Sequence, residues 1–163
     1  MLHKLTQSAD QLFGFDAADA HCDIPCKIYD PAVALIAALS VVRMVDILNE
    51  AAAKDPGLDR DNTISRCIAL KEVEAAKVKE EVRVIWSDYF KAPQIEAHPN
   101  VHSLVHSILM TASKCKQTVD RAAAEELVEL VNQFAEMFWQ TKGVETERKE
   151  APYPPSMAVV RPV

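Results

Sequence analysis

The sequence contains few of the residues that are most common in loops and sheets. It has three glycines, and aromatic residues make up 6% of its 163 positions. Ala, Leu, Val, Glu and Lys are abundant instead, and this composition favours helix over strand. Because 49% of the residues are hydrophobic, the chain can fill one real core, and we expect a single all-α domain.

Several features that would point to a particular partner or compartment are also missing. The formal charge of −6 and the absence of a dense run of Lys and Arg argue against a nucleic-acid partner. The longest apolar run is far shorter than the roughly 20 residues that cross a bilayer. Residues 1–20 have no apolar stretch of the length that an export signal requires. We expect a cytoplasmic protein with no membrane partner, whose four cysteines stay reduced.

Four helices are predicted from apolar residues that recur at helical spacing. They span about residues 31–54, 61–90, 99–116 and 119–142. Asp30 and Pro31 suit the start of the first helix, and Gly143 suits the end of the last. Because the connections are short, the helices are expected to form an antiparallel four-helix bundle.

Two of the predicted helices have distinctive surfaces. The first is apolar on nearly every face between Ala32 and Val42, so it must be buried on more than one side. We expect one face to pack inside the bundle and the other to contact another subunit. The middle of the second helix, from Lys71 to Glu81, is heavily charged and is expected to be a solvated face.

The densest group of chemically active side chains lies just before the first helix. It reads His21-Cys22-Asp23-Ile24-Pro25-Cys26-Lys27-Ile28-Tyr29-Asp30-Pro31. His21, Cys22 and Cys26 offer nitrogen and sulfur donors, which suit zinc, copper or nickel better than magnesium or calcium. On spacing alone, a short disulfide or two unrelated free thiols is the simpler explanation, and a zinc site would need two further ligands.

The full stretch resembles the amino-terminal hook of the nickel superoxide dismutases, which reads His-Cys-Asp-x-Pro-Cys-x-x-Tyr-Asp-Pro. Every fixed position of that pattern is present between His21 and Pro31. A second segment, from Trp86 to Lys91 and followed by Pro93, is similar to the family's other marked segment. The resemblance covers roughly residues 21–143 and implies a four-helix bundle with an N-terminal metal-binding hook.

This resemblance implies a nickel ion in each subunit and the dismutation of superoxide to oxygen and hydrogen peroxide. The nickel would cycle between Ni(II) and Ni(III). The implied ligands are the amine and imidazole of His21, the backbone nitrogen and thiolate of Cys22, and the thiolate of Cys26. Tyr29 and Tyr89 match the family's catalytic tyrosines, which crowd the open face of the metal and order water or an anion there.

The resemblance also implies how the protein matures and assembles. Residues 1–20 would be a leader that a dedicated protease removes by cutting between Ala20 and His21. The cut matters because it converts the nitrogen of His21 from an amide into an amine with a pKa of roughly 7.7 to 8.0, which can bind a metal near neutral pH. The mature chain, which would begin at His21, is expected to form a homohexamer.

The sequence departs from the family at the residues that support the axial imidazole. Better-known members use a glutamate in the first helix and an arginine in the second, where this chain has Ala37 and Glu74. The partners of His21 are therefore expected to differ here. Because the net charge opposes an anionic substrate, we expect a local cationic patch such as Lys27 and Lys91 to steer superoxide.

The last segment, residues 144–163, lies beyond the resemblance. A charged patch is followed by four prolines, which predicts a flexible Pro-rich C-terminal tail without a core of its own. An arm that reaches a neighbouring subunit is the alternative.

Other candidate side chains fit ordinary structural roles better than functional ones. His98, His102 and His106 are four residues apart, but His98 precedes Pro99 and is expected to lie outside the helix. Cys67 and Cys115 are expected to be buried as small apolar residues. A different function also remains open at this stage, because His21, Cys22 and Cys26 would equally serve a non-catalytic metal-handling or thiol-switch helical oligomer.

Overall fold

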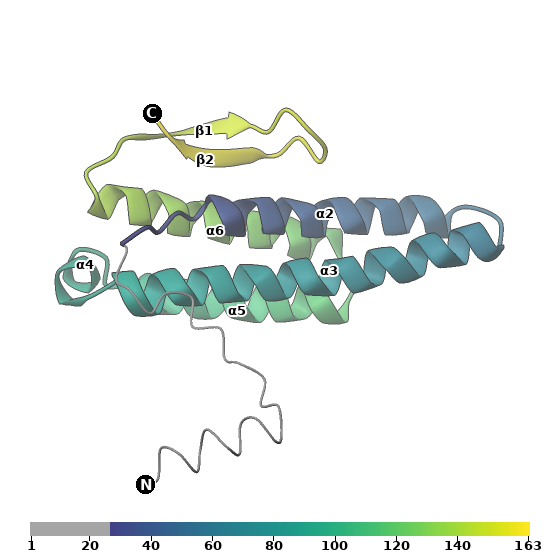
Figure 1. Ribbon diagram of the computed structural model, residues 1–163, viewed down its shortest axis with the longest axis horizontal. Helices are drawn as coiled ribbons and strands as arrows, with labels where there is room; N and C mark the ends of the chain where they lie inside the picture. The colour runs from purple at the N-terminus through teal and green to yellow at the C-terminus, as the bar shows by residue number, and fades with distance from the viewer. Residues whose placement is uncertain (1–26) are drawn as a thin grey trace, which may run out of the picture.

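Four long helices lie side by side in the computed structural model, which describes residues 27–163 (Figure 1). They are α2 (Ala32–Ala52), α3 (Leu58–Val84), α5 (Val101–Gln117) and α6 (Arg121–Thr141). Helix α2 packs against α3 and α6, and α5 packs against the same two helices. Consecutive long helices run in opposite directions, which confirms the predicted antiparallel four-helix bundle.

The ends of the bundle helices follow the expected capping chemistry. An oxygen of the Asp30 carboxylate accepts a hydrogen bond from the backbone N–H of Ala32 at 2.8 Å, at the start of α2. At the other end of the chain, Gly143 has a φ of +67°, a conformation that a glycine adopts without a Cβ clash. The N–H of Val144 then donates to the carbonyl of Trp139 at 3.1 Å. Gly143 therefore ends α6 as predicted.

The connection between α3 and α5 contains two short elements that the apolar pattern did not separate. A π-helical turn, η1 (Ile85–Tyr89), continues α3, and a short helix, α4 (Ala92–Ala97), follows it. The turn closes with a hydrogen bond from the N–H of Phe90 to the carbonyl of Ile85 at 3.4 Å. Single π turns inside helices are often found at functional sites.

The core consists mainly of small aliphatic side chains, with phenylalanines at one end. Its fully buried members include Val41, Val42, Val45, Val78, Val82, Val105, Ile108, Leu127, Phe134 and Phe138. Helix α2 has 21 residues and a mean hydropathy of 1.9 in its most apolar stretch, which by length and composition alone would suffice to cross a membrane. Half of that stretch is buried inside the bundle, so packing accounts for its apolar composition.

The charged middle of α3 is less exposed than its sequence predicts. Ala75 and Val78 are fully buried, and the side chain of Lys71 is only 2% exposed. The Lys71 ammonium group donates hydrogen bonds to the carbonyl of Cys115 and, at 2.9 Å, to that of Lys116. Lys71 therefore caps the last turn of α5, and the prediction of a purely solvated face is wrong at this residue.

The prediction of a flexible C-terminal tail is also wrong. Strands β1 (Thr146–Glu150) and β2 (Ala158–Pro162) form an antiparallel hairpin in which Arg148 lies opposite Val160. The hairpin lies along the outside of the bundle, next to α6 and α2 (Figure 1). Val159 and Val160 of β2 are buried. The hairpin thus packs on its own chain.

A buried amide attaches this proline-rich segment to the bundle. The side chain of Asn132 on α6 donates to the carbonyl of Ala158 at 2.9 Å and accepts from the N–H of Val160 at 2.9 Å. These backbone groups lie on the edge of β2 that faces away from β1. The third position on that edge is Pro162, which has no N–H to satisfy. On that edge, Asn132 therefore pairs with the N–H of Val160 and the carbonyl of Ala158.

The hairpin also covers part of the outer face of α2. Leu35 and Leu39 of α2 and Val159 and Val160 of β2 line a small pocket of about 140 Å³. Part of the face that was expected to contact another subunit is thus covered by the same chain. Ile36, on the same face, remains 55% exposed.

Candidate metal centre

The three predicted metal ligands, His21, Cys22 and Cys26, lie outside the described residues. Their donor set nevertheless fits nickel on chemical grounds, because an amine, an imidazole and two thiolates are the nitrogen and sulfur donors that Ni(II) accepts in a tetragonal arrangement. The described structure begins one residue after Cys26, so it shows where the hook joins the bundle.

The residues of the hook that follow Cys26 lead directly to the aromatic end of the bundle. Lys27 has a φ of +58°, and Tyr29 packs against the buried core. The rings of Tyr29 and Tyr89 lie 5.9 Å apart between centroids, at an angle of 53°. Two tyrosines separated by sixty positions in the sequence are therefore brought together near Lys27, the first described residue after Cys26.

The position of Tyr89 is set by the π turn and by α6. Tyr89 is the last residue of η1, and its ring contacts those of Phe90 and Phe138 at centroid distances of 5.4 and 4.8 Å. Its hydroxyl lies 2.7 Å from the hydroxyl oxygen of Thr141. Both the ring and the hydroxyl group of Tyr89 are therefore held by contacts with neighbouring residues.

A small hollow of about 160 Å³ lies beside Tyr29. Its walls come from residues 28–30, the start of α2, the end of α3 and the first residue of η1. They are formed by Ile28, Tyr29, Asp30, Val33, Glu81, Val84 and Ile85. The hollow is mainly apolar, and Glu81 adds an acidic group at its edge.

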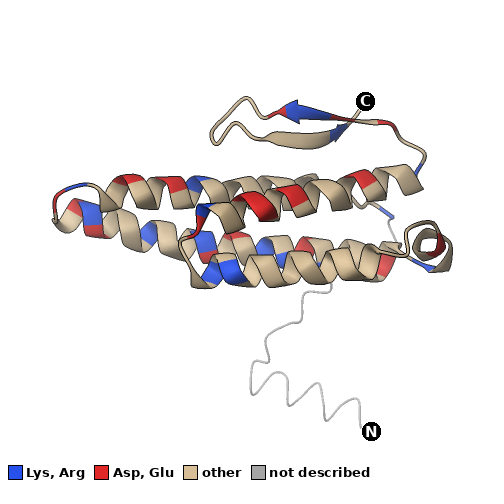
Figure 2. Ribbon diagram, turned by 180° about the vertical axis from the view of Figure 1, so that it is seen from behind, with Lys and Arg blue, Asp and Glu red and all other residues tan. Residues whose placement is uncertain are grey.

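Two lysines near Tyr89, Lys91 and Lys142, make specific contacts. The Lys91 ammonium group donates to the carbonyl of Ser87 at 2.9 Å. The Lys142 ammonium group lies 5.2 Å from the centre of the Tyr89 ring and 5.1 Å from that of Phe138. Both lysines are exposed. Over the rest of the described chain, acidic and basic residues are interspersed along the helices, and acidic residues outnumber basic ones on α6 (Figure 2).

The histidine series does not form a metal site in the part of the chain that the structure describes. His102 accepts a hydrogen bond through Nδ1 from the indole N–H of Trp86 at 3.0 Å. Within residues 27–163, no group of three His, Cys, Asp or Glu side chains could hold a metal ion. The Trp86–His102 bond instead ties the turn after α3 to α5.

The two positions where the family's imidazole partners would stand are occupied differently. Ala37 is fully buried inside the bundle, and its methyl group cannot form a hydrogen bond. Glu74 lies on α3 and is partly exposed. Neither residue reproduces the glutamate and arginine pair that the resemblance leads one to expect.

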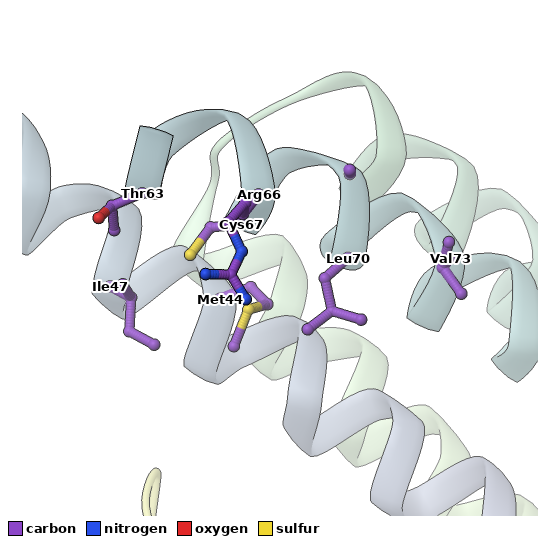
Figure 3. A pocket seen from close by; sticks show the side chains of 8 residues that line it. Met44, Ile47, Thr63, Arg66, Cys67, Leu70 and Val73 are labelled. Carbon is purple, nitrogen blue, oxygen red and sulfur yellow. The ribbon is translucent and has the colours of Figure 1, made fainter. Parts of the chain in front are cut away.

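The isolated cysteines are buried, as predicted. Burial raises the pKa of the Cys115 thiol to about 11, so Cys115 stays protonated at neutral pH and does not react as a thiolate. Cys67 lines an open groove of about 660 Å³ between α2 and α3, together with Met44, Ile47, Leu70 and Val73 (Figure 3). The groove runs along the second half of α2 and the first half of α3.

Sequence reasoning missed Thr141 and Lys142. Both residues contact Tyr89 from the last turn of α6. The only signal available in the sequence was their position just before Gly143, the predicted end of the helix. Nothing in the spacing connects them to a tyrosine in a different element.

Together, the fold and the site define a four-helix-bundle protein with a paired-tyrosine end next to an N-terminal segment rich in metal-binding donors. Comparisons with known proteins agree with this class. The family model for nickel-containing superoxide dismutases matches residues 16–142. The chain therefore belongs to the nickel-containing superoxide dismutase family.

Individual relatives cover most of the chain. The nickel superoxide dismutase of Streptomyces coelicolor is 38% identical over 123 residues, which are 76% of this chain and 88% of the relative. The enzyme of Streptomyces seoulensis is 39% identical over the same shares. A solved structure of native nickel superoxide dismutase superposes with a TM-score of 0.66 at 37% identity, covering 76% of this chain and 99% of the other.

Proposed function

We propose that this protein converts superoxide to oxygen and hydrogen peroxide at a nickel centre held by the N-terminal hook. The observation that carries the proposal is the family match over residues 16–142, which spans both the hook and the Trp86 segment. The close approach of Tyr29 and Tyr89, 5.9 Å between ring centroids, supports it. We assign nickel binding to His21, Cys22 and Cys26.

The chain's own residues supply the donors and the surroundings of the site. After cleavage, the amine and imidazole of His21 offer nitrogen donors, and the thiols of Cys22 and Cys26 offer sulfur once they are deprotonated. The bound nickel would supply one-electron chemistry between Ni(II) and Ni(III). Tyr29 and Tyr89 crowd the approach to the hook and restrict which small molecules reach it. Both tyrosines act by gating.

Maturation is part of the proposal. While residue 20 is attached, the nitrogen of His21 is an amide and a poor ligand. A protease that cuts between Ala20 and His21 would release the amine, so nickel binding would follow cleavage. We further propose that the protein works in the cytoplasm, where the hook thiols stay reduced before metal binding.

We also propose that the mature chain assembles as a homohexamer. Its surface supports self-association, because the groove between α2 and α3 has mainly apolar walls (Figure 3) and two of its lining residues, Leu70 and Val73, are 43% and 59% exposed. Apolar patches of this kind mark contacts between proteins. The subunit number can be read from the mass of the nickel-loaded protein by sedimentation analysis.

The first test is intact mass and metal content of protein made with the maturation protease and nickel present. The expected product begins at His21, holds about one nickel per subunit and dismutates superoxide. Protein that still begins at Met1 and holds no nickel, despite demonstrated protease activity, would contradict the proposal. Nickel-loaded protein without activity would indicate a metal-handling protein instead.

A matched pair of cysteine variants locates the site. Cys22→Ser removes a proposed ligand and should abolish both nickel uptake and activity, while the helical circular dichroism spectrum stays unchanged. Cys67→Ser makes the same chemical change in the bundle, away from the hook, and should keep nickel and activity. A Cys22→Ser variant that still dismutates superoxide would show that the proposed ligand set is wrong.

A further inference from the structure

The hydroxyl of Thr141 lies between two oxygen atoms. It is 2.6 Å from the carbonyl oxygen of Phe138, to which it donates, and 2.7 Å from the hydroxyl of Tyr89. A threonine hydroxyl has one hydrogen and two lone pairs. Because a carbonyl can only accept, the Thr141 hydrogen is used there. The hydrogen in the second contact must then come from Tyr89.

We propose that Thr141 is a positioning residue for Tyr89, fixing the phenol as a hydrogen-bond donor toward α6. This inference rests on the proposed function, in which Tyr89 gates the nickel site. With its only hydrogen committed to Thr141, the Tyr89 oxygen can accept a hydrogen bond from water or from a protonated product. It cannot donate one to an anion. Tyr89 therefore does not retain anions beside the metal.

Lys142, the residue after Thr141, holds the same tyrosine by its ring. Its ammonium group lies 5.2 Å from the Tyr89 ring centre and 5.1 Å from that of Phe138, distances at which a cation is attracted to an aromatic face. Consecutive residues at the end of α6 thus fix the hydroxyl and the ring of Tyr89. The end of α6 therefore helps to position one of the two tyrosines that restrict access to the nickel site.

The bond can be observed without nickel. The chain has three tyrosines, so the full-length protein labelled with carbon-13 at the ring carbon that bears the hydroxyl gives three signals, which Tyr→Phe variants assign. Thr141→Val should shift the Tyr89 signal, because it keeps the side-chain shape and removes the acceptor. Thr141→Ser, which keeps the hydroxyl, should leave the signal in place. An unchanged Tyr89 signal in Thr141→Val would overturn the inference.

Thr118→Val is the matched control. The hydroxyl of Thr118 donates to the carbonyl of Lys114 at 2.8 Å at the end of α5, the same type of bond without a phenol. This variant should leave all three tyrosine signals unchanged. If Thr141→Val does not fold, Thr141→Ala removes the same acceptor with less bulk and has the same expected result.

The functional test uses azide as a small anionic probe on the nickel-loaded enzyme. Thr141→Val frees the phenol hydrogen, so azide should inhibit at about a tenth of the concentration needed for the wild type. A tenfold change corresponds to the free energy of about one hydrogen bond to a charged group. Adding Tyr89→Phe should remove this gain. Unchanged azide inhibition in Thr141→Val would contradict the inference. If the wild type has no dismutase activity, the proposed function fails, whereas the tyrosine signals still test the bond.

Discussion

Lys71 shows how one residue can decide the end of a helix. Burial lowers the pKa of its ammonium group below the ordinary value, and the group nevertheless donates to the carbonyls of Cys115 and Lys116. Those carbonyls are among the last four of α5, which have no partner within their own helix. The two bonds offset the cost of removing a charge from water.

We predict that Lys71→Met destabilises the protein by about 1–3 kcal/mol, because the aliphatic stem is kept while buried carbonyls lose their donor. Urea unfolding followed by circular dichroism measures the change. Lys77→Met, at an exposed position of the same helix, is the control and should alter stability by less than about 0.5 kcal/mol. Equal effects of the two variants would mean that the capping bonds contribute nothing.

The sequence could not have revealed the roles of Lys71 and Thr141. Lys71 lies in a charged stretch that is typical of a solvated face, and its partners are on a different helix. Thr141 acts on a tyrosine in the turn after α3. By contrast, the burial of Cys67 and Cys115 was predictable, because a cysteine on the apolar face of a helix packs as a small hydrophobic residue. Residue roles that depend on another element need the fold.

At the scale of elements, Arg148 joins the hairpin to the bundle. Its guanidinium group donates to the carboxylates of Glu129 and Glu136 on α6, at 2.7 and 2.6 Å. The hydrogen bonds from Arg148 hold the pKa of Glu129 below its ordinary value near 4.5. Because this carboxylate is more acidic in the folded state, its stabilising contribution is fully present above the unfolded pKa and is lost as the pH falls through the folded pKa.

We therefore predict that the hairpin loosens below about pH 4.5, while the four helices remain folded. Hydrogen exchange measured at matched intrinsic rates should show faster exchange in β1 and β2 at pH 3 than at pH 6. Arg148→Met should give the faster exchange already at neutral pH. Lys149→Met, in which a more exposed neighbour is changed, should not. A hairpin whose protection is independent of both pH and Arg148 would contradict this account.

The helices were predictable and the hairpin was not, for physical reasons. Apolar residues at helical spacing mark α2, α5 and α6, and Gly143 ends α6 by its left-handed conformation. Residues 146–150 read Thr-Glu-Arg-Lys-Glu, which lacks the alternation of a half-buried strand. Strand β2 is hydrogen-bonded to Asn132, a residue inside a helix. The π turn likewise has no signature in the sequence beyond the motif that resembles the family.

At the scale of the whole molecule, the hairpin lies outside the part of the chain that the family model matches. The family match ends at residue 142, and the solved native structure is covered to 99% of its chain by 76% of this one. Residues 144–163 therefore lie beyond the shared part. They cover Leu35 and Leu39 on α2, on the apolar helix that we expected to meet another subunit.

Removing residues 144–163 should leave a folded bundle that binds nickel and dismutates superoxide at a rate close to that of the full chain, because Thr141 and Lys142 are retained and the remaining chain matches the relatives. The exposed α2 and α6 surface should lower the thermal midpoint by several degrees and promote self-association, which sedimentation analysis detects.

Arg148→Met in the full chain tests whether the hairpin only shields the helices or also contributes to catalysis. It weakens the attachment of the hairpin without shortening the chain, so it should lower the thermal midpoint less than the truncation does and leave activity unchanged. A truncated protein that keeps its nickel and helicity but loses activity would place the hairpin in the reaction itself. Because the hairpin begins five residues after Thr141, such a result would mean that it orients the end of α6, and with it Tyr89.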